Sequence, residues 1–226
     1  MRPKISNSFK TDIMKKHILL LILICISLTS FGKTRDTLKY TTFSPKTNVK
    51  LNTLVCIGVI NPAFELRLSN KFSIQLEGLG VISSDNYLGT GYPLQMWSCF
   101  LEPRWYPKRV FNGFFLGANV GSGAFRLNKN ILYKFFGWSP DLNYKKYEHS
   151  VQIGANLMAG ITLGYTYTFK CNPHWAVEAN WSMGRQWAIY EDYLYKDEKV
   201  EHHIPNNGSA EYMPFYRGGI YISYKW

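Results

Sequence analysis

The sequence predicts an all-β fold, an eight-stranded antiparallel up-and-down transmembrane β-barrel with short periplasmic turns and long extracellular loops. Three observations lead to this prediction. Long segments alternate apolar and polar residues with a period of two, aromatic residues gather at the ends of these segments, and the connections between them alternate between short and long. Each feature is typical of barrels that cross an outer membrane with strands.

The chain begins with a segment that has the composition of a secretory signal peptide, residues 1–32. A basic stretch at 14–17 precedes the apolar run 18–26, and small residues suit cleavage after Gly32. The run is shorter than the about 20 residues that a membrane-spanning helix needs. We therefore expect export, with Met14 as an alternative start. A lipoprotein signal at Cys25 is the alternative interpretation, although Cys25 lacks the small residue expected before it.

Residues 33–47 are expected to form a periplasmic N-terminal segment, and residues 48–226 the barrel. From Lys33 on, the chain holds 21 basic and 14 acidic side chains, a net charge of +7. The basic residues are dispersed rather than gathered in a stripe, so we predict no nucleic-acid partner and expect contacts with anionic lipid head groups. Three cysteines remain without a C-x-x-C pair, which predicts no disulfide framework, metal site or cofactor. They are Cys56, Cys99 and Cys171.

The most informative segment is 151–169. Its odd positions are apolar or aromatic throughout, and its even positions are Gln, Gly, Asn, Met or Thr. An alternation of this length has the period of a strand, and it exceeds the 5 or 6 residues usual for strands in globular proteins. A tilted strand crosses a bilayer in about 9–11 residues. The segment is therefore long enough to cross a membrane and project beyond it.

Eight segments with strand character follow one another along the chain. They are 48–57, 62–68, 72–82, 95–106, 113–127, 151–169, 174–189 and 214–226. The connections 69–71, 107–112 and 170–173 are short, whereas 83–94, 128–150 and 190–213 are long, and 58–61 is a short member of the long set. Short turns at one end and long loops at the other are the rule for outer-membrane barrels, with both termini on the periplasmic side.

Aromatic residues lie near the ends of several predicted strands, as in the girdles at the two membrane interfaces. These pairs are Trp97 and Trp105, Tyr165 and Tyr167, Trp175 and Trp187, and Tyr216 and Tyr224. Trp226 ends the last strand. A terminal aromatic of this kind resembles the signal by which the outer-membrane assembly machinery recognises barrels, so we predict that Trp226 is an assembly signal.

Short motifs in a fixed order resemble a family of small outer-membrane barrels from the Bacteroidetes, catalogued as domain-of-unknown-function family 3575. They are K-T-N-V-K-L-N at 46–52, N-P-A-F-E at 61–65, E-P-R-W-Y at 102–106, F-N-G-F-F-L-G at 111–117, G-I-T-L-G-Y at 160–165 and H-W-A-V-E-A at 174–179. The resemblance covers about residues 46–226. It implies a barrel, often encoded beside fimbrial or other surface genes, without an assigned reaction. The segment 191–213 departs from the pattern.

Charged residues recur on the predicted inward face of the strands. They are Lys50, Glu65, Arg67, Glu77, Glu102, Arg104, Glu178 and Arg217. Arg or Lys facing lipid at the bilayer midplane costs about 2–4 kcal/mol. Eight strands leave an interior only wide enough for side chains. We therefore predict a lumen closed by a network of paired charges, with a narrow polar pathway as the alternative.

The predicted loop 128–150 is rich in aromatic and basic side chains. The candidate contact residues are Tyr133, Phe135, Phe136, Trp138, Lys145 and Lys146. Such side chains suit contacts with a glycan, lipopolysaccharide phosphate or a protein partner. Packing of the loop on itself explains the same composition equally well.

No catalytic constellation stands out, so the protein is expected not to be an enzyme. His149-Ser150 is the best candidate for a lipid-modifying enzyme similar to lipid A deacylases, which use a His–Ser pair. Neighbouring residues of a strand point to opposite faces, however. His202 and His203 beside Glu198 and Glu201 offer metal ligands without fixed geometry. The glycine-rich stretch 117–123 departs from G-x-G-x-x-G, and its glycines more plausibly make room for inward side chains.

The sequence therefore predicts a non-enzymatic protein of the outer membrane of a Gram-negative bacterium. Its extracellular loops would anchor or support surface structures or bind partners. The expected partners are outer-membrane lipid and lipopolysaccharide, the assembly machinery, and a surface protein or fimbrial component. A lipid-modifying enzyme and a small pore are the alternatives.

Overall fold

The computed structural model describes residues 44–83, 94–128, 150–196 and 199–226. The predicted signal peptide and all but the end residues of the predicted loops 83–94 and 128–150 lie outside these residues. Chain contacts separate one unit, Ser44–Thr168 with His174–Trp226, from a second unit, Met1–Phe43 with Phe169–Pro173. All the strands belong to the first unit, and Phe169–Pro173 is a turn within the chain between two of them.

The described residues are almost entirely β-structure. The elements are β1 (Thr47–Asn52), η1 (a 3-10 helix, Thr53–Ile57), β2 (Val59–Ile60), β3 (Pro62–Arg67), β4 (Phe72–Ser83), β5 (Leu94–Trp105), β6 (Gly113–Leu127), β7 (Ser150–Thr168), β8 (Trp175–Lys196) and β9 (Lys199–Lys225). No helix in the described part of the chain is long and apolar enough to span a membrane.

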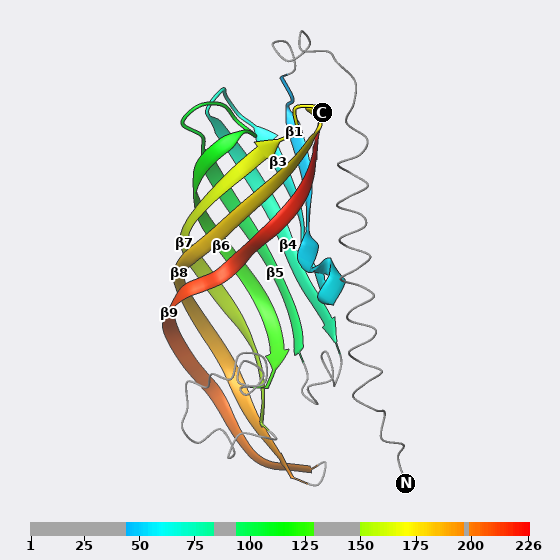
Figure 1. The fold of residues 1–226 in the computed structure, drawn as a ribbon. Coiled ribbons are helices and arrows are strands. Elements are labelled where there is room, and N and C mark those ends of the chain that lie inside the picture. Colours follow the sequence, from blue (N-terminus) through cyan, green and yellow to red (C-terminus); the bar gives the residue numbers. More distant parts are fainter. Residues whose placement is uncertain (1–43, 84–93, 129–149, 197–198) are drawn as a thin grey trace, which may run out of the picture. The chain divides into compact units, whose positions relative to one another are not determined.

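The nine strands form one antiparallel sheet that closes on itself through eight of them (Figure 1). The order around the ring is β4-β3-β1-β9-β8-β7-β6-β5, and the pairing of β5 with β4 completes it. β2 is the ninth strand and pairs with the far end of β4. The predicted all-β, antiparallel, eight-stranded closure is thus confirmed, with β2 as an additional short strand.

The last strand closes the ring against the first. Val49 of β1 lies opposite Tyr224 of β9, and Asn52 lies opposite Tyr221. At the end of this pairing the amide of Trp226 donates to the carbonyl of Thr47 at 3.1 Å, and Lys46 N donates to the Trp226 carbonyl at 2.9 Å. The short connections β3–β4 and β5–β6, the last residue of β7 and the first residue of β8 lie at this same end, which is the upper end in Figure 1.

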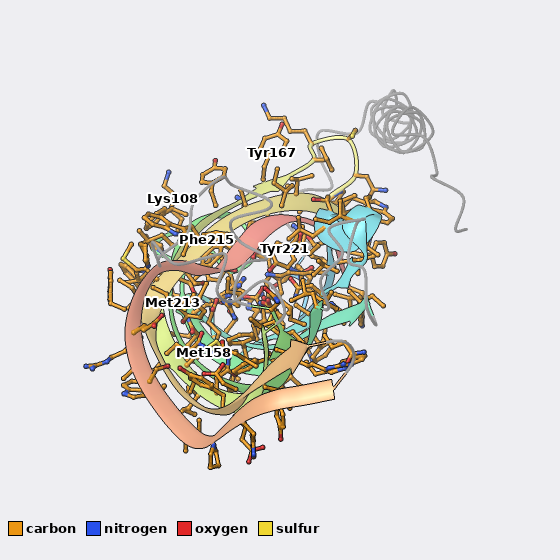
Figure 2. The ribbon with its side chains drawn as sticks, turned by 90° about the horizontal axis from the view of Figure 1, so that it is seen from below. Lys108, Met158, Tyr167, Met213, Phe215 and Tyr221 are labelled. Carbon is orange, nitrogen blue, oxygen red and sulfur yellow. The ribbon has the colours of Figure 1, made fainter. Side chains whose placement is uncertain are left out.

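The predicted alternation decides which side chains face inward. On β6, Phe115, Gly117 and Asn119 are buried inside the ring, whereas Leu116 and Val120 are exposed on its outer face. Seen along the ring, Tyr221 lies inside it and Tyr167 outside it (Figure 2). The outer face is apolar across neighbouring strands, because Leu76, Leu101 and Val120 are register neighbours on β4, β5 and β6.

The predicted first strand, 48–57, is wrong beyond Asn52. The Asn52 side chain accepts the amide of Leu54 at 3.1 Å and so caps a turn of 3-10 helix. Gly58 ends that helix in the left-handed conformation, with φ at 83°. The predicted connection 58–61 in turn contains β2. The local capping bonds override the strand pattern here.

The predicted loop 190–213 is also wrong, because it is a β-ribbon. β8 continues to Lys196, and β9 begins at Lys199 and pairs with β8 along its length. Three register shifts interrupt this pairing, between Ser182 and Gly184, Tyr190 and Asp192, and Leu194 and Tyr195. Extra residues at these irregularities break the two-residue alternation, so the segment has no simple strand pattern.

Tyr216 does not belong to the outer aromatic girdle. Between the pairs Ser182–Arg217 and Gly184–Met213, β9 holds two more residues than β8. This bulge turns the Tyr216 hydroxyl inward, where it donates to Asn119 Oδ1, and leaves Phe215 exposed on the outer face. The other predicted girdle residues are partly exposed on the outside.

Candidate functional site

The interior of the ring holds a continuous network of charged side chains. Six strands contribute to it: Lys50 on β1, Glu65 on β3, Glu77 on β4, Glu102 and Arg104 on β5, Glu178 on β8 and Arg217 on β9. Each of these side chains has 0% exposure. Seven of the eight predicted lumen charges therefore lie together, as the alternation predicted.

The first part of the network is a four-membered cluster near the turn end of the ring. Lys50 Nζ lies 2.6 Å from Glu65 Oε2 and 2.5 Å from Glu178 Oε2. Arg104 Nη1 lies 2.8 Å from Glu178 Oε1 and 3.5 Å from Glu65 Oε2. Each cation therefore contacts both carboxylates, and the cluster joins β1, β3, β5 and β8.

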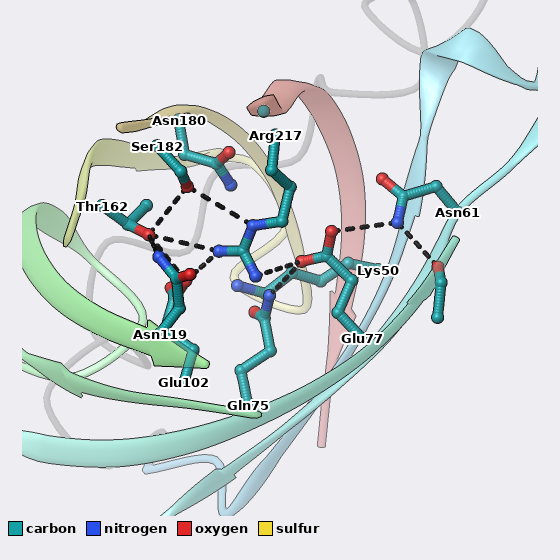
Figure 3. Close-up of polar contacts among 12 residues, drawn as sticks. Lys50, Asn61, Gln75, Glu77, Glu102, Asn119, Thr162, Asn180, Ser182 and Arg217 are labelled. Atoms are coloured by element: carbon teal, nitrogen blue, oxygen red, sulfur yellow. Dashed lines mark hydrogen bonds and ion pairs between the residues drawn. The ribbon is translucent and has the colours of Figure 1, made fainter. Parts of the chain in front are cut away.

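The second part centres on Arg217, which forms an ion pair with Glu102 and lies 3.4 Å from Glu77 (Figure 3). Glu102 also accepts from Arg104 Nε at 2.5 Å. Glu102 thus links the two parts of the network through its two oxygens. The linked groups come from strands on opposite sides of the ring, since three strands separate β9 from β5 in each direction around it.

Neutral polar side chains complete the coordination of the carboxylates. Glu77 accepts from Asn61 Nδ2 at 2.9 Å and from Gln75 Nε2 at 2.8 Å. Thr162 Oγ1 donates to Glu102 at 2.7 Å, and Tyr106 Oη donates to Glu65 at 2.9 Å. Buried carboxylates need such donors because desolvation otherwise penalises their charge.

These neutral partners were not among the predicted site residues. The inward alternation was the signal that could have found Thr162 and also Tyr221, whose hydroxyl donates to Glu77 Oε1 at 3.2 Å. No spacing rule points to Asn61, because it lies between β2 and β3 and reaches Glu77 only through the pairing of β3 with β4.

The buried charges balance. Among the described residues, four acidic and four basic side chains are buried, the fourth basic one being Lys225. Lys225 Nζ donates to Thr168 Oγ1 at 2.6 Å and to the Phe111 carbonyl at 3.3 Å. A neutral sum inside a low-dielectric interior avoids an uncompensated buried charge, which would cost several kcal/mol.

Aromatic rings fill the space that the charges leave. The Arg104 guanidinium lies over the Phe115 ring at 4.3 Å, and that of Arg217 over the Phe100 ring at 5.0 Å. Two glycines make room for these groups, as the glycine-rich stretch predicted. A Cβ on Gly121 would lie 2.2 Å from the Phe100 ring, and a Cβ on Gly117 would lie 2.9 Å from the Glu102 carboxyl.

Arg67 was predicted inside the lumen and does not join the network. It is the last residue of β3, and its guanidinium bonds to Ser44 and Asn70 near the turn that follows. The strand ends before its inward position reaches the interior, so the side chain is only half-buried.

The candidate loop contacts lie outside the described residues: Tyr133, Phe135, Phe136, Trp138, Lys145 and Lys146. His149 lies outside them too, as do the side chains of Ser150, Glu201 and His202 and the whole of Glu198. Trp226 is half-exposed at the end of the ring, and its ring centroid lies 6.1 Å from that of Tyr224.

His203 is described, and its neighbour is a residue that the predicted metal site did not include. Its Nε2 lies 3.3 Å from Glu191 Oε2 across the β8–β9 ribbon, and its ring stacks on Tyr193 at 4.5 Å. The hydrogen bonds from Tyr193 and then from His203 lower the pKa of the Glu191 carboxyl. No group of three or more potential metal ligands gathers within the described part of the chain.

The geometry indicates what the network does. Every charged member is sealed from solvent and held by at least two strands, so the network cross-links the ring and fills its interior.

A family model described as a protein of unknown function, DUF3575, matches residues 18–225, nearly the whole chain. No curated protein and no solved structure matches the chain significantly.

Proposed function

The chain belongs to the DUF3575 family, and we propose that it is a non-enzymatic outer-membrane β-barrel with a side-chain-filled lumen. In this proposal the barrel is a membrane anchor, and its extracellular loops support surface structures or bind partners.

The observation that carries the proposal is the inverted distribution of polarity. Seven charged side chains form a buried network inside the ring, and the outer face carries large apolar residues that remain exposed. Leu76 is 53% exposed and Ile161 48%. A contiguous apolar face of this extent is unfavourable in water and suits lipid.

The closed ring provides a second argument. A backbone in lipid needs internal partners for its N–H and C=O groups, and a closed sheet supplies them. β4 to β9 have between 12 and 27 residues, and a crossing takes about 9–11. The turns and Trp226 would face the periplasm, and the β8–β9 ribbon would face the cell exterior.

Membrane fractionation tests the location. The folded protein is expected in the outer-membrane fraction, and it should migrate differently on gels before and after boiling, because a folded barrel resists detergent at room temperature. Recovery as a soluble periplasmic species would contradict the proposal.

A loop replacement tests the anchoring role. We expect a Gly/Ser linker in place of residues 129–149 to leave insertion and heat modifiability intact and to reduce the amount of surface structure, measured by electron microscopy of whole cells. The matched control replaces residues 84–93. Equal amounts of surface structure with both replacements would show that residues 129–149 have no specific role in supporting surface structures.

A further inference from the structure

The outer face of the ring has a groove of about 360 Å³ over β4. Its floor is Gly78 and Gly80, one wall is Ile60 and Pro62, and the other is the β5 segment around Trp97. The lining is almost wholly apolar, and the volume is within the range of about 300–1,000 Å³ typical of ligand sites.

The groove exists because two successive outward positions on β4 lack side chains. A Cβ on Gly80 would lie 2.8 Å from the Trp97 ring, so the indole covers Gly80 closely. At Gly78 the nearest atom to such a Cβ is Pro62 Cγ, 4.0 Å away, so this end is open. The result is a slot, roofed at one end, in an otherwise convex apolar wall.

The groove lies in the half of the wall nearer the loops. Phe72 and Trp105 are register partners near the turn end, and Gly78 and Gly80 are six and eight residues further along β4. At about 3.3 Å per residue and a tilt near 40°, the groove lies roughly 15–20 Å above that level, within an apolar band about 25 Å tall.

A basic side chain lies nearer the loops than the groove, two strands away from β4 on β6. Ala124 on β6 is the register partner of Trp97, and Arg126, two residues nearer the loops, is the partner of Gln95. The alternation of β6 places Arg126 on the outer face, where it is half-buried. An arginine beside an apolar slot and nearer the loops offers a guanidinium for a phosphate at head-group level and an alkyl stem for its chain.

We propose that this groove binds one acyl chain of a lipopolysaccharide molecule and that Arg126 binds a phosphate of the same molecule. The inference rests on the proposed outer-membrane location. Lipopolysaccharide is the occupant favoured here because the slot lies at the level of the outer leaflet and because charge and apolar surface are arranged in the order of its phosphate and acyl chains.

Native mass spectrometry of the full-length folded protein in detergent micelles tests this. With purified lipopolysaccharide, the wild type is expected to retain one molecule, and Gly78→Leu, which fills the slot, should reduce retention at least fivefold. Ala118→Leu, which places the same final side chain on the outer face of β6 away from the groove, should leave retention unchanged. Arg126→Gln should weaken retention without changing the shape of the slot, because it removes only the charge that would bind the phosphate.

Each outcome decides a different point. Equal retention by wild type and Gly78→Leu would overturn the inference, as would preferential retention of phosphatidylethanolamine over lipopolysaccharide in a competition. A heat-modifiable, membrane-inserted protein that retains neither lipid would overturn only this inference. A soluble protein would overturn the proposed function as well. If Gly78→Leu fails to fold, the Arg126→Gln measurement still decides.

Discussion

Glu102 is the single residue on which the two parts of the interior network depend. One of its oxygens accepts from Arg104 and the other contacts Arg217. Thr162 also donates to it. The remaining charged pairs would survive its loss, but two guanidinium groups would each lose a buried counter-ion.

We expect Glu102→Gln to lower the free energy of unfolding by about 3–5 kcal/mol, the cost of breaking a buried ion pair from one side. Denaturant unfolding in micelles, followed by heat modifiability, measures this. Glu191→Gln is the matched control because Glu191 is on the projecting ribbon. A loss below about 1 kcal/mol, the value typical of exposed pairs, would mean that the network is solvated.

The inward position of most network charges could be predicted from alternation, because side-chain direction on a regular strand depends only on parity. Their partners could not. Glu102 and Arg217 are 115 residues apart and meet only because the ring closes in one particular register. Tyr216 was predicted wrongly for a related reason, since a bulge on β9 changes the parity over a few residues.

At the scale of elements, side chains of neighbouring strands donate hydrogen bonds to backbone carbonyls in the irregular part of β9. β1 ends at Asn52, which lies opposite Tyr221 of β9. The residues of β9 that precede Tyr221 therefore have no β1 residue opposite them. Asn52 Nδ2 donates to the Gly218 carbonyl at 3.2 Å, and Trp181 Nε1 donates to the Pro214 carbonyl at 2.8 Å. The Asn52 bond is buried, whereas the Trp181 bond is on the exposed side, where in the proposed barrel no water would replace the donor to Pro214.

In the proposed membrane setting, Trp181→Phe is therefore expected to destabilise the protein by about 1–3 kcal/mol, the range for an acceptor shielded from water that loses its donor. The phenyl ring keeps most of the apolar surface. Trp187→Phe on the same strand is the control, because it removes an indole of the same size whose ring contacts Arg185 instead. Equal unfolding midpoints of the two variants would show that the Trp181 bond contributes nothing specific.

The β8–β9 ribbon should respond to acid. The folded state lowers the Glu191 pKa below 4.5, so its contribution to stability is present above that pH and is lost as the pH falls through the lowered pKa. Amide-exchange protection of Tyr193 and His203 should therefore be constant down to about 4.5 and then decrease.

Glu191→Gln is the control for this prediction and should abolish the acid step. A step that persists in that variant, or one centred near the ordinary histidine pKa of about 6.5, would assign the response to another group. The ribbon itself was missed in the sequence because register shifts obscure its alternation. Only the pairing with β8 defines it.

At the scale of the whole molecule, closure depends on the last residue as well as on the last strand. The Trp226 backbone pairs with Lys46 and Thr47, and its side chain is on the outer face. Deleting Trp226 is expected to reduce the amount of protein in the outer membrane without preventing refolding of the purified chain in micelles. Trp226→Phe keeps an aromatic terminus and should assemble normally. Normal insertion of the deletion variant would exclude Trp226 as an assembly signal.

The closed interior leads to a last prediction, that the protein does not conduct ions. An aromatic cluster closes the interior towards the turn end: Tyr106, Phe111 and Phe115 pack together with at most 1% exposure. The ion-pair network fills the neighbouring part of the interior, between β5 and β9. Eight strands leave an interior only about wide enough for such side chains.

Planar bilayers containing the wild type should therefore show no single-channel steps, with insertion verified by heat modifiability and a 16-stranded porin as the positive control. Arg217→Ala should also be silent, because Phe100, Glu77 and Glu102 remain around the vacated space and the aromatic cluster still closes the turn end. Stepwise currents in the wild type would mean that the network opens in the membrane. Steps confined to the variant would identify Arg217 as the plug.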